Sequence, residues 1–173
     1  MPISQVTSES SLMPTYNRFP IEIAKGKGSY VWDNEDKKYL DFTSGIATCN
    51  LGHVPDEVEK KVEAQLHTLW HCSNLYHIPS QEKLAKKLTE LSCFDKVFFC
   101  NSGAEANEAA IKLARRYSKK VKKSEAYEVI TFSQSFHGRT LATLSATAQT
   151  KIQEGFAPLL DGFAYLPYND MAA

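Results

Sequence analysis

The sequence lacks the features that would place it in a membrane or outside the cell. None of its apolar runs approaches the roughly 18–20 residues of a membrane-spanning helix. Residues 1–11 do not have the basic-then-apolar pattern of a secretory signal. The four cysteines lie far apart, with no Cys-x-x-Cys pair, which predicts reduced thiols rather than disulfides. These absences favour a cytoplasmic protein.

The sequence also has no excess of charge of either sign. Lys plus Arg and Asp plus Glu both total 20 among its 173 residues, so net charge gives no pull toward nucleic acid or an anionic membrane. The one basic run, at 119–123, is typical of a solvated helix end. His67 and His71 stand four apart on an expected helix, but no glutamate follows His67 as in the His-Glu-x-x-His zinc motif. We therefore expect structural histidines and no metal site.

The first part of the chain predicts a small antiparallel meander followed by helices. With 43% hydrophobic residues, the chain should be globular. The Gly-Lys-Gly stretch at 26–28 lacks the spacing of a P-loop, so a hairpin turn is expected there. Pro55 suits the first position of a helix. The expected elements are a loosely held arm over 1–20, strands at 21–24, 30–32 and 38–42, turns at 26–28 and 33–36, and helices from Pro55 and over about 79–91.

From residue 96 onward, apolar strands alternate with helices, which is typical of an α/β protein with a mainly parallel sheet. Three parallel strands would make a thin sheet with an open edge, so we expect a fold that is cut short. The expected elements are strands at 97–100, 128–132 and 163–166, a short helix after Gly138, and a helix over 103–117 whose stripe of Ala106, Ala109, Ala110, Leu113, Ala114 and Tyr117 faces the sheet.

The turn between the first of these strands and its helix is a candidate anion site. Ser102, Gly103 and Ala104 lead from the apolar run into the helix. The amides of a first helical turn have no intrahelical partners, and the helix dipole favours negative charge there, so a phosphate would bind well. Ser102 and Glu105 fit a capping box, although a carboxylate close to a phosphate is unfavourable unless it points away. The alternative is a well-capped helix start with no ligand.

A second cluster, Ser135 to Arg139, follows the next strand and so lies at the same carboxyl edge of the sheet, where ligands of α/β proteins bind. Phe136 offers a flat apolar face for an aromatic cofactor, and Gly138 permits close approach of the backbone. Arg139 offers a planar fork that suits a carboxylate. The alternative is a buried phenylalanine and a surface arginine at a helix start. Two ligand-suited clusters at successive strand ends favour a binding site.

Four stretches of the sequence resemble the class III pyridoxal-phosphate aminotransferases. The resemblance implies a truncated type I aminotransferase fold, with pyridoxal 5'-phosphate as cofactor. Ser102, Gly103 and Ala104 would hold the cofactor phosphate, Phe136 would stack on its ring, and Arg139 would bind the substrate α-carboxylate. The stretches are Gly26–Asp33, Asp41–Ala47, Asn101–Arg115 and Phe136–Thr140.

Within that family, residues 69–76 and 166–170 are most similar to the enzymes that move the δ-amino group of N2-acetylornithine to 2-oxoglutarate in arginine biosynthesis. The resemblance implies a homodimeric full-length enzyme. It assigns residues 1–75 to an arm and small-domain segment with a connecting helix, and residues 76–173 to the first part of the large cofactor-binding domain.

The family's Schiff-base lysine and the aspartate that pairs with the pyridine nitrogen are expected downstream of residue 173. No lysine here stands in that motif, so we expect no catalytic residue in this chain and no activity from it alone. Two alternatives stay open. One is a class III enzyme that acts on ornithine, succinylornithine or 4-aminobutyrate. The other is a short non-catalytic protein that binds phosphate or a partner.

Overall fold

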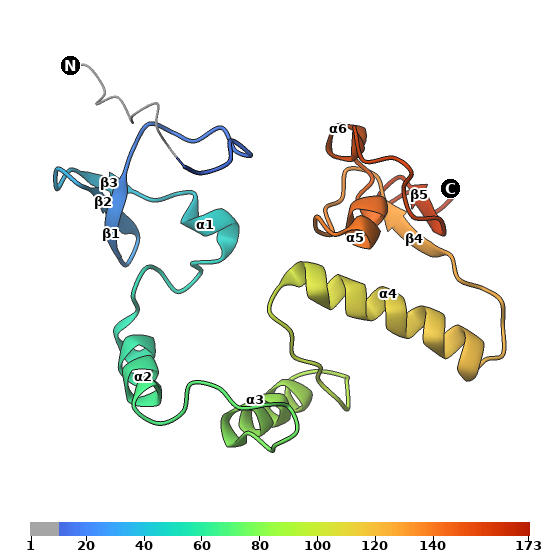
Figure 1. Ribbon diagram of the computed structural model, residues 1–173, viewed down its shortest axis with the longest axis horizontal. Helices are drawn as coiled ribbons and strands as arrows, with labels where there is room; N and C mark the ends of the chain where they lie inside the picture. The colour runs from blue at the N-terminus through green and yellow to red at the C-terminus, as the bar shows by residue number, and fades with distance from the viewer. Residues whose placement is uncertain (1–10) are drawn as a thin grey trace. The chain divides into compact units, whose positions relative to one another are not determined.

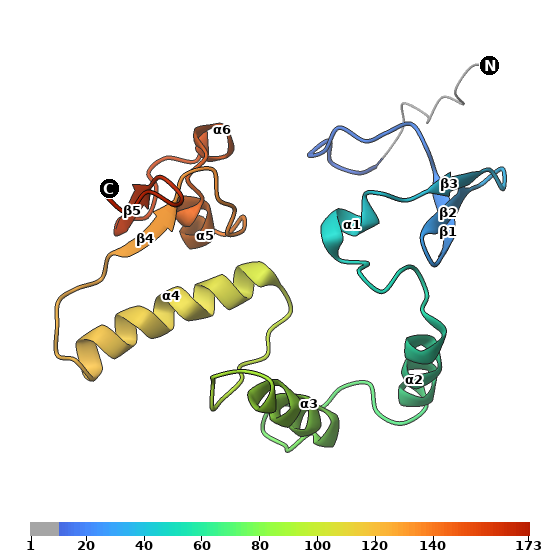
Figure 2. The ribbon, with the colours of Figure 1, turned by 180° about the vertical axis from the view of Figure 1, so that it is seen from behind.

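The computed structural model describes residues 11–173. The chain forms two compact units that divide between Ile78 and Pro79 (Figures 1 and 2). The first ten residues of the expected arm, and nearly all of the segment searched for a signal pattern, lie outside the described residues. Residues 11–22 form no helix or strand.

The first unit contains the expected antiparallel meander. Its strands are β1 (Ile23–Lys27), β2 (Tyr30–Asp33) and β3 (Lys38–Leu40), hydrogen-bonded in the order β1-β2-β3. The expected turn at 26–28 is misplaced, because Gly26 and Lys27 pair with β2 and belong to β1. The reversal instead begins at Gly28, whose positive φ of 58° suits a glycine.

Two helical segments follow the meander. Residues Ser44–Ala47 (α1) form a short turn in which all four residues have positive φ. The helix α2 spans Asp56–Leu66. Pro55 precedes this helix in an extended conformation (ψ 125°), so it is the capping residue and not the first helical residue. Asp56, Glu57 and Glu59 lie in the first turn, where their negative charge complements the helix dipole.

The second unit is the α/β part of the chain. Its strands β4 (Val129–Phe132) and β5 (Phe163–Leu166) pair in parallel, with Val129 opposite Phe163. This confirms the parallel pairing and both strand positions. The helices are α3 (Pro79–Glu90), α4 (Gly103–Lys120), α5 (Leu141–Ala146) and α6 (Thr150–Gln153). The most buried residues of this unit gather in and just after α5, where Thr143, Leu144, Ser145, Ala146 and Thr147 are at most 4% exposed.

The strand expected at 97–100 does not form. The segment has no strand partner among the described residues, and Phe98 is 74% exposed. A strand exists only through hydrogen bonds to a neighbour, and strands that follow one another in the sequence are not always neighbours in the sheet. The apolar pattern therefore indicated a segment suited to a strand but not whether a partner was present. The expected three-stranded sheet has two strands.

The helix expected over 103–117 forms as α4, but a different face of it packs. Leu113 and Tyr117 of the expected stripe are 67% and 49% exposed. The packed side carries Ile111, which is 8% exposed, and Arg115, which donates to the carbonyl oxygen of Asp161 at 2.9 Å. The prediction of the buried face was wrong because the buried Ile111 and hydrogen bonds from polar side chains, and not the alanine stripe, attach this helix to the rest of the unit.

Candidate functional site

The start of α4 is a capped helix N-terminus with open space in front of it. The Ser102 hydroxyl accepts a hydrogen bond from the Glu105 amide at 3.2 Å. The Glu105 carboxylate accepts from the amide of Asn101 at 2.5 Å. The expected capping box is therefore shifted by one residue, since the carboxylate reaches the residue before Ser102. This contact holds the Glu105 carboxylate against the backbone of Asn101, and its negative charge stays close to the start of the helix.

The residues of this turn fit a phosphate group. Among the described residues, the amides of Gly103 and Ala104 donate to no protein acceptor. A Cβ added to Gly103 would meet no atom within 4 Å, so a ligand can approach the backbone there. Two unpaired amides at the positive end of an 18-residue helix are the kind of donors that can bind an anion.

The loop that carries the second cluster packs directly against this helix start. The Asn107 side-chain amide donates to the carbonyl oxygen of His137 at 2.8 Å. Gly138 is buried against the first turn, since a Cβ added to it would lie 2.8 Å from the Cβ of Ala104. The Thr140 hydroxyl donates to the Glu108 carboxylate. The structure therefore brings the two sequence clusters together, and α5 lies beside the first half of α4 (Figures 1 and 2).

The two side chains proposed for ligand contact in this loop are accessible. Phe136 is 57% exposed, so its ring has a face available for stacking. Arg139 is exposed one residue before the N-cap of α5, Thr140. The alternative of a buried phenylalanine is wrong, whereas the surface position expected for Arg139 in that alternative is observed.

Sequence reasoning missed Asn107 and Glu108, which attach α4 to this loop. Both were placed on a helix whose expected packing face was the alanine stripe. The available signal was that Ala104, Asn107 and Ile111 share one face at helical spacing, a face that includes a polar residue able to donate to a carbonyl oxygen.

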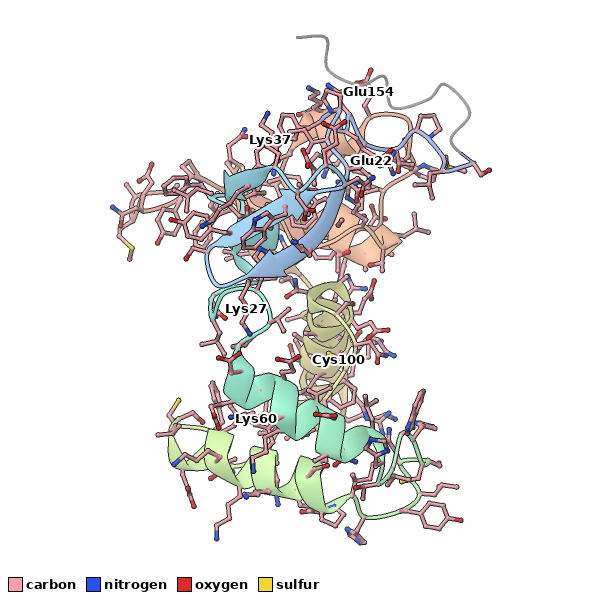
Figure 3. The ribbon with its side chains drawn as sticks, turned by 90° about the vertical axis from the view of Figure 1, so that its left-hand side faces the viewer. Glu22, Lys27, Lys37, Lys60, Cys100 and Glu154 are labelled. Atoms are coloured by element: carbon pink, nitrogen blue, oxygen red, sulfur yellow. The ribbon has the colours of Figure 1, made fainter. Side chains whose placement is uncertain are left out.

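A shallow cavity of about 330 Å³ lies on another side of α4, along residues 98–101. Its wall includes Phe98, Cys100, Glu105 and Lys112 (Cys100 is labelled in Figure 3). Neither Phe136 nor Arg139 lines it. It carries both signs of charge and does not coincide with the amides of Gly103 and Ala104.

Lys27 forms hydrogen bonds with neighbouring protein groups. This agrees with the expectation that the glycine-rich stretch is a hairpin and not a P-loop. Its ammonium group donates to the carbonyl oxygen of Val54 at 2.7 Å and to the Asp56 carboxylate (Figure 3). The hydrogen bond to Asp56 raises the pKa of Lys27 above its ordinary value of 10.5. Lys27 thus attaches the hairpin to the start of α2.

A second polar contact supports the α1 segment. Asp41 accepts hydrogen bonds from the amides of Thr43 and Ser44, both at 2.9 Å, and its other oxygen lies 2.7 Å from His53 Nε2. The bond to His53, followed by the bond from Ser44, lowers the pKa of Asp41. Asp41 thus links the meander to both ends of the segment that contains α1.

No cluster of three or more His, Cys, Asp or Glu side chains suited to a metal ion occurs in residues 11–173. Within the same range, every helix is too short or too polar to cross a bilayer.

The family model for class-III aminotransferases matches residues 12–173. The chain is 66% identical over 161 residues to the acetylornithine aminotransferase of Oceanobacillus iheyensis, covering 93% of this chain and 40% of that protein. It is 57% identical to the acetylornithine aminotransferase of Halalkalibacterium halodurans, covering 95% of this chain and 41% of that one. The chain therefore spans about 40% of the length of these relatives.

Solved structures of aminotransferases are also similar to this chain. The ornithine aminotransferase of Toxoplasma gondii superposes with a TM-score of 0.87 at 28% identity, covering 92% of this chain and 38% of that one. The omega transaminase of Pseudomonas jessenii, solved in complex with PMP, gives a TM-score of 0.83 at 30% identity over 91% of this chain and 37% of that one. The architecture is that of the type I pyridoxal-phosphate aminotransferase fold, over the part of it that this chain spans. The chain belongs to the class-III aminotransferase family.

Proposed function

We propose that this chain is the N-terminal portion of an enzyme that transfers the δ-amino group of N2-acetylornithine to 2-oxoglutarate, giving N-acetylglutamate 5-semialdehyde and glutamate. The observation that carries the proposal is the packing of the 136–139 loop against the start of α4, which joins an anion site to an aromatic ring and a guanidinium group. The identity of up to 66% with acetylornithine aminotransferases supports the choice of amino donor.

The residues of this chain would bind and orient the reactants. Ser102, Gly103 and Ala104 hold the phosphate of pyridoxal 5'-phosphate, Phe136 stacks on its ring, and Arg139 binds the α-carboxylate of the substrate. The cofactor, when bound, supplies the electron-withdrawing ring that makes amino-group transfer possible. We expect the lysine that would bind the cofactor covalently to lie outside this chain, so we expect no activity from the chain alone.

Further assignments go with this proposal. Residues 1–75 form the arm and small-domain segment, and residues 76–173 begin the cofactor-binding domain. The full-length enzyme works as a homodimer in the cytoplasm, on small-molecule substrates.

Binding of pyridoxal 5'-phosphate to the purified chain, measured by equilibrium dialysis, tests the site. We expect Phe136→Ala to weaken binding by about 1 kcal/mol or more, because ring stacking is lost. Arg139→Ala should leave cofactor binding intact, and in an enzyme extended to the relatives' length it should raise the KM for N2-acetylornithine. Absence of cofactor binding by the unmodified chain, or its collapse in Arg139→Ala, would contradict these roles.

A further inference from the structure

Phe136 is exposed, yet the backbone on both sides of it is held by hydrogen bonds. The peptide group before it is fixed at the Ser135 carbonyl oxygen, which accepts from the Gln149 side-chain amide at 2.9 Å. The peptide group after it is fixed at the His137 amide, which donates to the Thr147 hydroxyl at 2.9 Å. Because the two peptide planes that flank a residue set its φ and ψ, these bonds set the direction of the Cα–Cβ bond of Phe136.

The third contact holds the same loop to α4. Asn107 donates to the carbonyl oxygen of His137, so His137 is bound through its amide by one element and through its carbonyl by another. The Thr147 hydroxyl donates in turn to the carbonyl oxygen of Thr143 at 2.9 Å. Thr147 is 0% exposed, so water cannot easily replace this hydroxyl as the acceptor for His137.

We infer that Asn107, Thr147 and Gln149 are positioning residues that hold Phe136 at a fixed place beside the start of α4, ready to stack on the cofactor ring. This inference rests on the proposed function of the site. An exposed aromatic side chain on an unrestrained loop would lose backbone freedom on binding. The three hydrogen bonds impose that order before the ligand arrives, so binding costs less.

The proposed positioning role should affect the binding of pyridoxal 5'-phosphate but not that of inorganic phosphate. Inorganic phosphate needs only the amides at the start of α4, whereas pyridoxal 5'-phosphate needs Phe136 as well. Loss of one positioning hydrogen bond should weaken pyridoxal phosphate binding about three- to tenfold and leave inorganic phosphate binding unchanged.

The variants are Asn107→Leu, which keeps the side-chain size but removes the donor, and Thr147→Val, which keeps the shape but removes the acceptor. Thr147→Ser retains the hydroxyl, so its ligand affinities and its hydrogen exchange should match those of the unmodified chain. Thr150→Val repeats the change of Thr147→Val at an exposed position of the same unit, and Arg116→Leu is a control for a leucine that replaces a polar side chain at an exposed position of α4. Circular dichroism establishes that each variant is folded.

Two measurements on the full chain decide the outcome. One is hydrogen exchange of the loop, and the other is the affinity for inorganic phosphate and for pyridoxal 5'-phosphate. Hydrogen exchange of the peptide that covers residues 133–139, followed by mass spectrometry without ligand, should accelerate in Asn107→Leu and Thr147→Val but not in Thr147→Ser or the controls. Unchanged exchange in both variants would overturn the inference, whatever the ligand data show. An equal loss of affinity for phosphate and pyridoxal phosphate would overturn it too, because that result indicates a general disturbance. If the unmodified chain bound no pyridoxal phosphate, the proposed function would fail first, while the exchange data would still report on the loop.

Discussion

Replacement of Gly138 by alanine should separate the helix start from the loop that packs on it. Gly138 has a φ of +135°, a value that side-chain-bearing residues rarely adopt. Its added Cβ would lie 2.7 Å from Thr143 Oγ1, 2.8 Å from the Cβ of Ala104 and 3.1 Å from the Cα of Ala104. Two of these three atoms belong to α4, so the steric conflict can be relieved only by moving the helix or the loop.

The expected cost has two parts. An unfavourable positive φ costs about 1–2 kcal/mol, and an extra methyl group in a packed site costs about 1–3 kcal/mol. Together they should lower the free energy of unfolding by about 2–5 kcal/mol. Gly155→Ala is the matched control, because Gly155 has a φ of +83° but no atom lies within 4 Å of its added Cβ. It should show only the backbone part, about 1–2 kcal/mol.

The assay is urea unfolding followed by far-ultraviolet circular dichroism, to which the long helix α4 contributes strongly. Gly138→Ala should unfold at a lower urea concentration than Gly155→Ala. The double variant with Ala104→Gly should recover part of the difference, because one of the close contacts is removed. Equal destabilisation by Gly138→Ala and Gly155→Ala would refute the reasoning, since it would mean that the loop and α4 are not in contact at this position.

Three more predictions follow from individual contacts. Ile111→Ala should lower the free energy of unfolding by about 2–4 kcal/mol, whereas Leu113→Ala should change it by less than about 0.5 kcal/mol; a reversed order in urea unfolding would restore the alanine stripe as the packed face. Ser102→Ala should cost about 1 kcal/mol through loss of the helix cap, while Ser102→Asp should retain stability in the same assay. The pKa of Asp41 is lowered on folding, so its carboxylate stabilises the fold fully above its ordinary pKa of 3.8, and this stability is lost as the pH falls through the lower folded value. Asp41→Asn should abolish that part of the acid dependence, measured as urea midpoints across an acid pH series; an unchanged acid profile would show that Asp41 does not titrate differently in the folded state.

Local signals predicted elements well wherever the structure depends on nearby residues. Ser102 caps α4 because its hydroxyl reaches an amide three residues later. Phe163–Leu166 forms a strand with the expected bounds, and Val129–Phe132 pairs with it in parallel. The helix cap and the strand bounds follow from residue types and short spacings, which a single sequence displays. The parallel pairing was predicted from the alternation of strands and helices along the chain.

Distant contacts set the features that were not predicted. The apolar segment 97–100 has the composition of a strand but no partner among the described residues. The packed face of α4 depends on what lies across from it, and Asn107 finds its acceptor 30 residues away, at His137. A sequence shows which side chains can donate or pack, but it does not show which acceptors the fold brings near them.

The sequence by itself determined the family, the order of most helices and strands, and the position of the two clusters that we propose as the binding site. It could do so because glycine turns, helix caps and short apolar periods act over a few residues. Only the tertiary structure decided that the two clusters touch, that Gly138 fits against Ala104, and that Asn107, Thr147 and Gln149 hold the backbone around Phe136. These contacts join residues 10 to 34 positions apart, and their formation depends on the packing of α4, α5 and the loop between β4 and α5 as one unit.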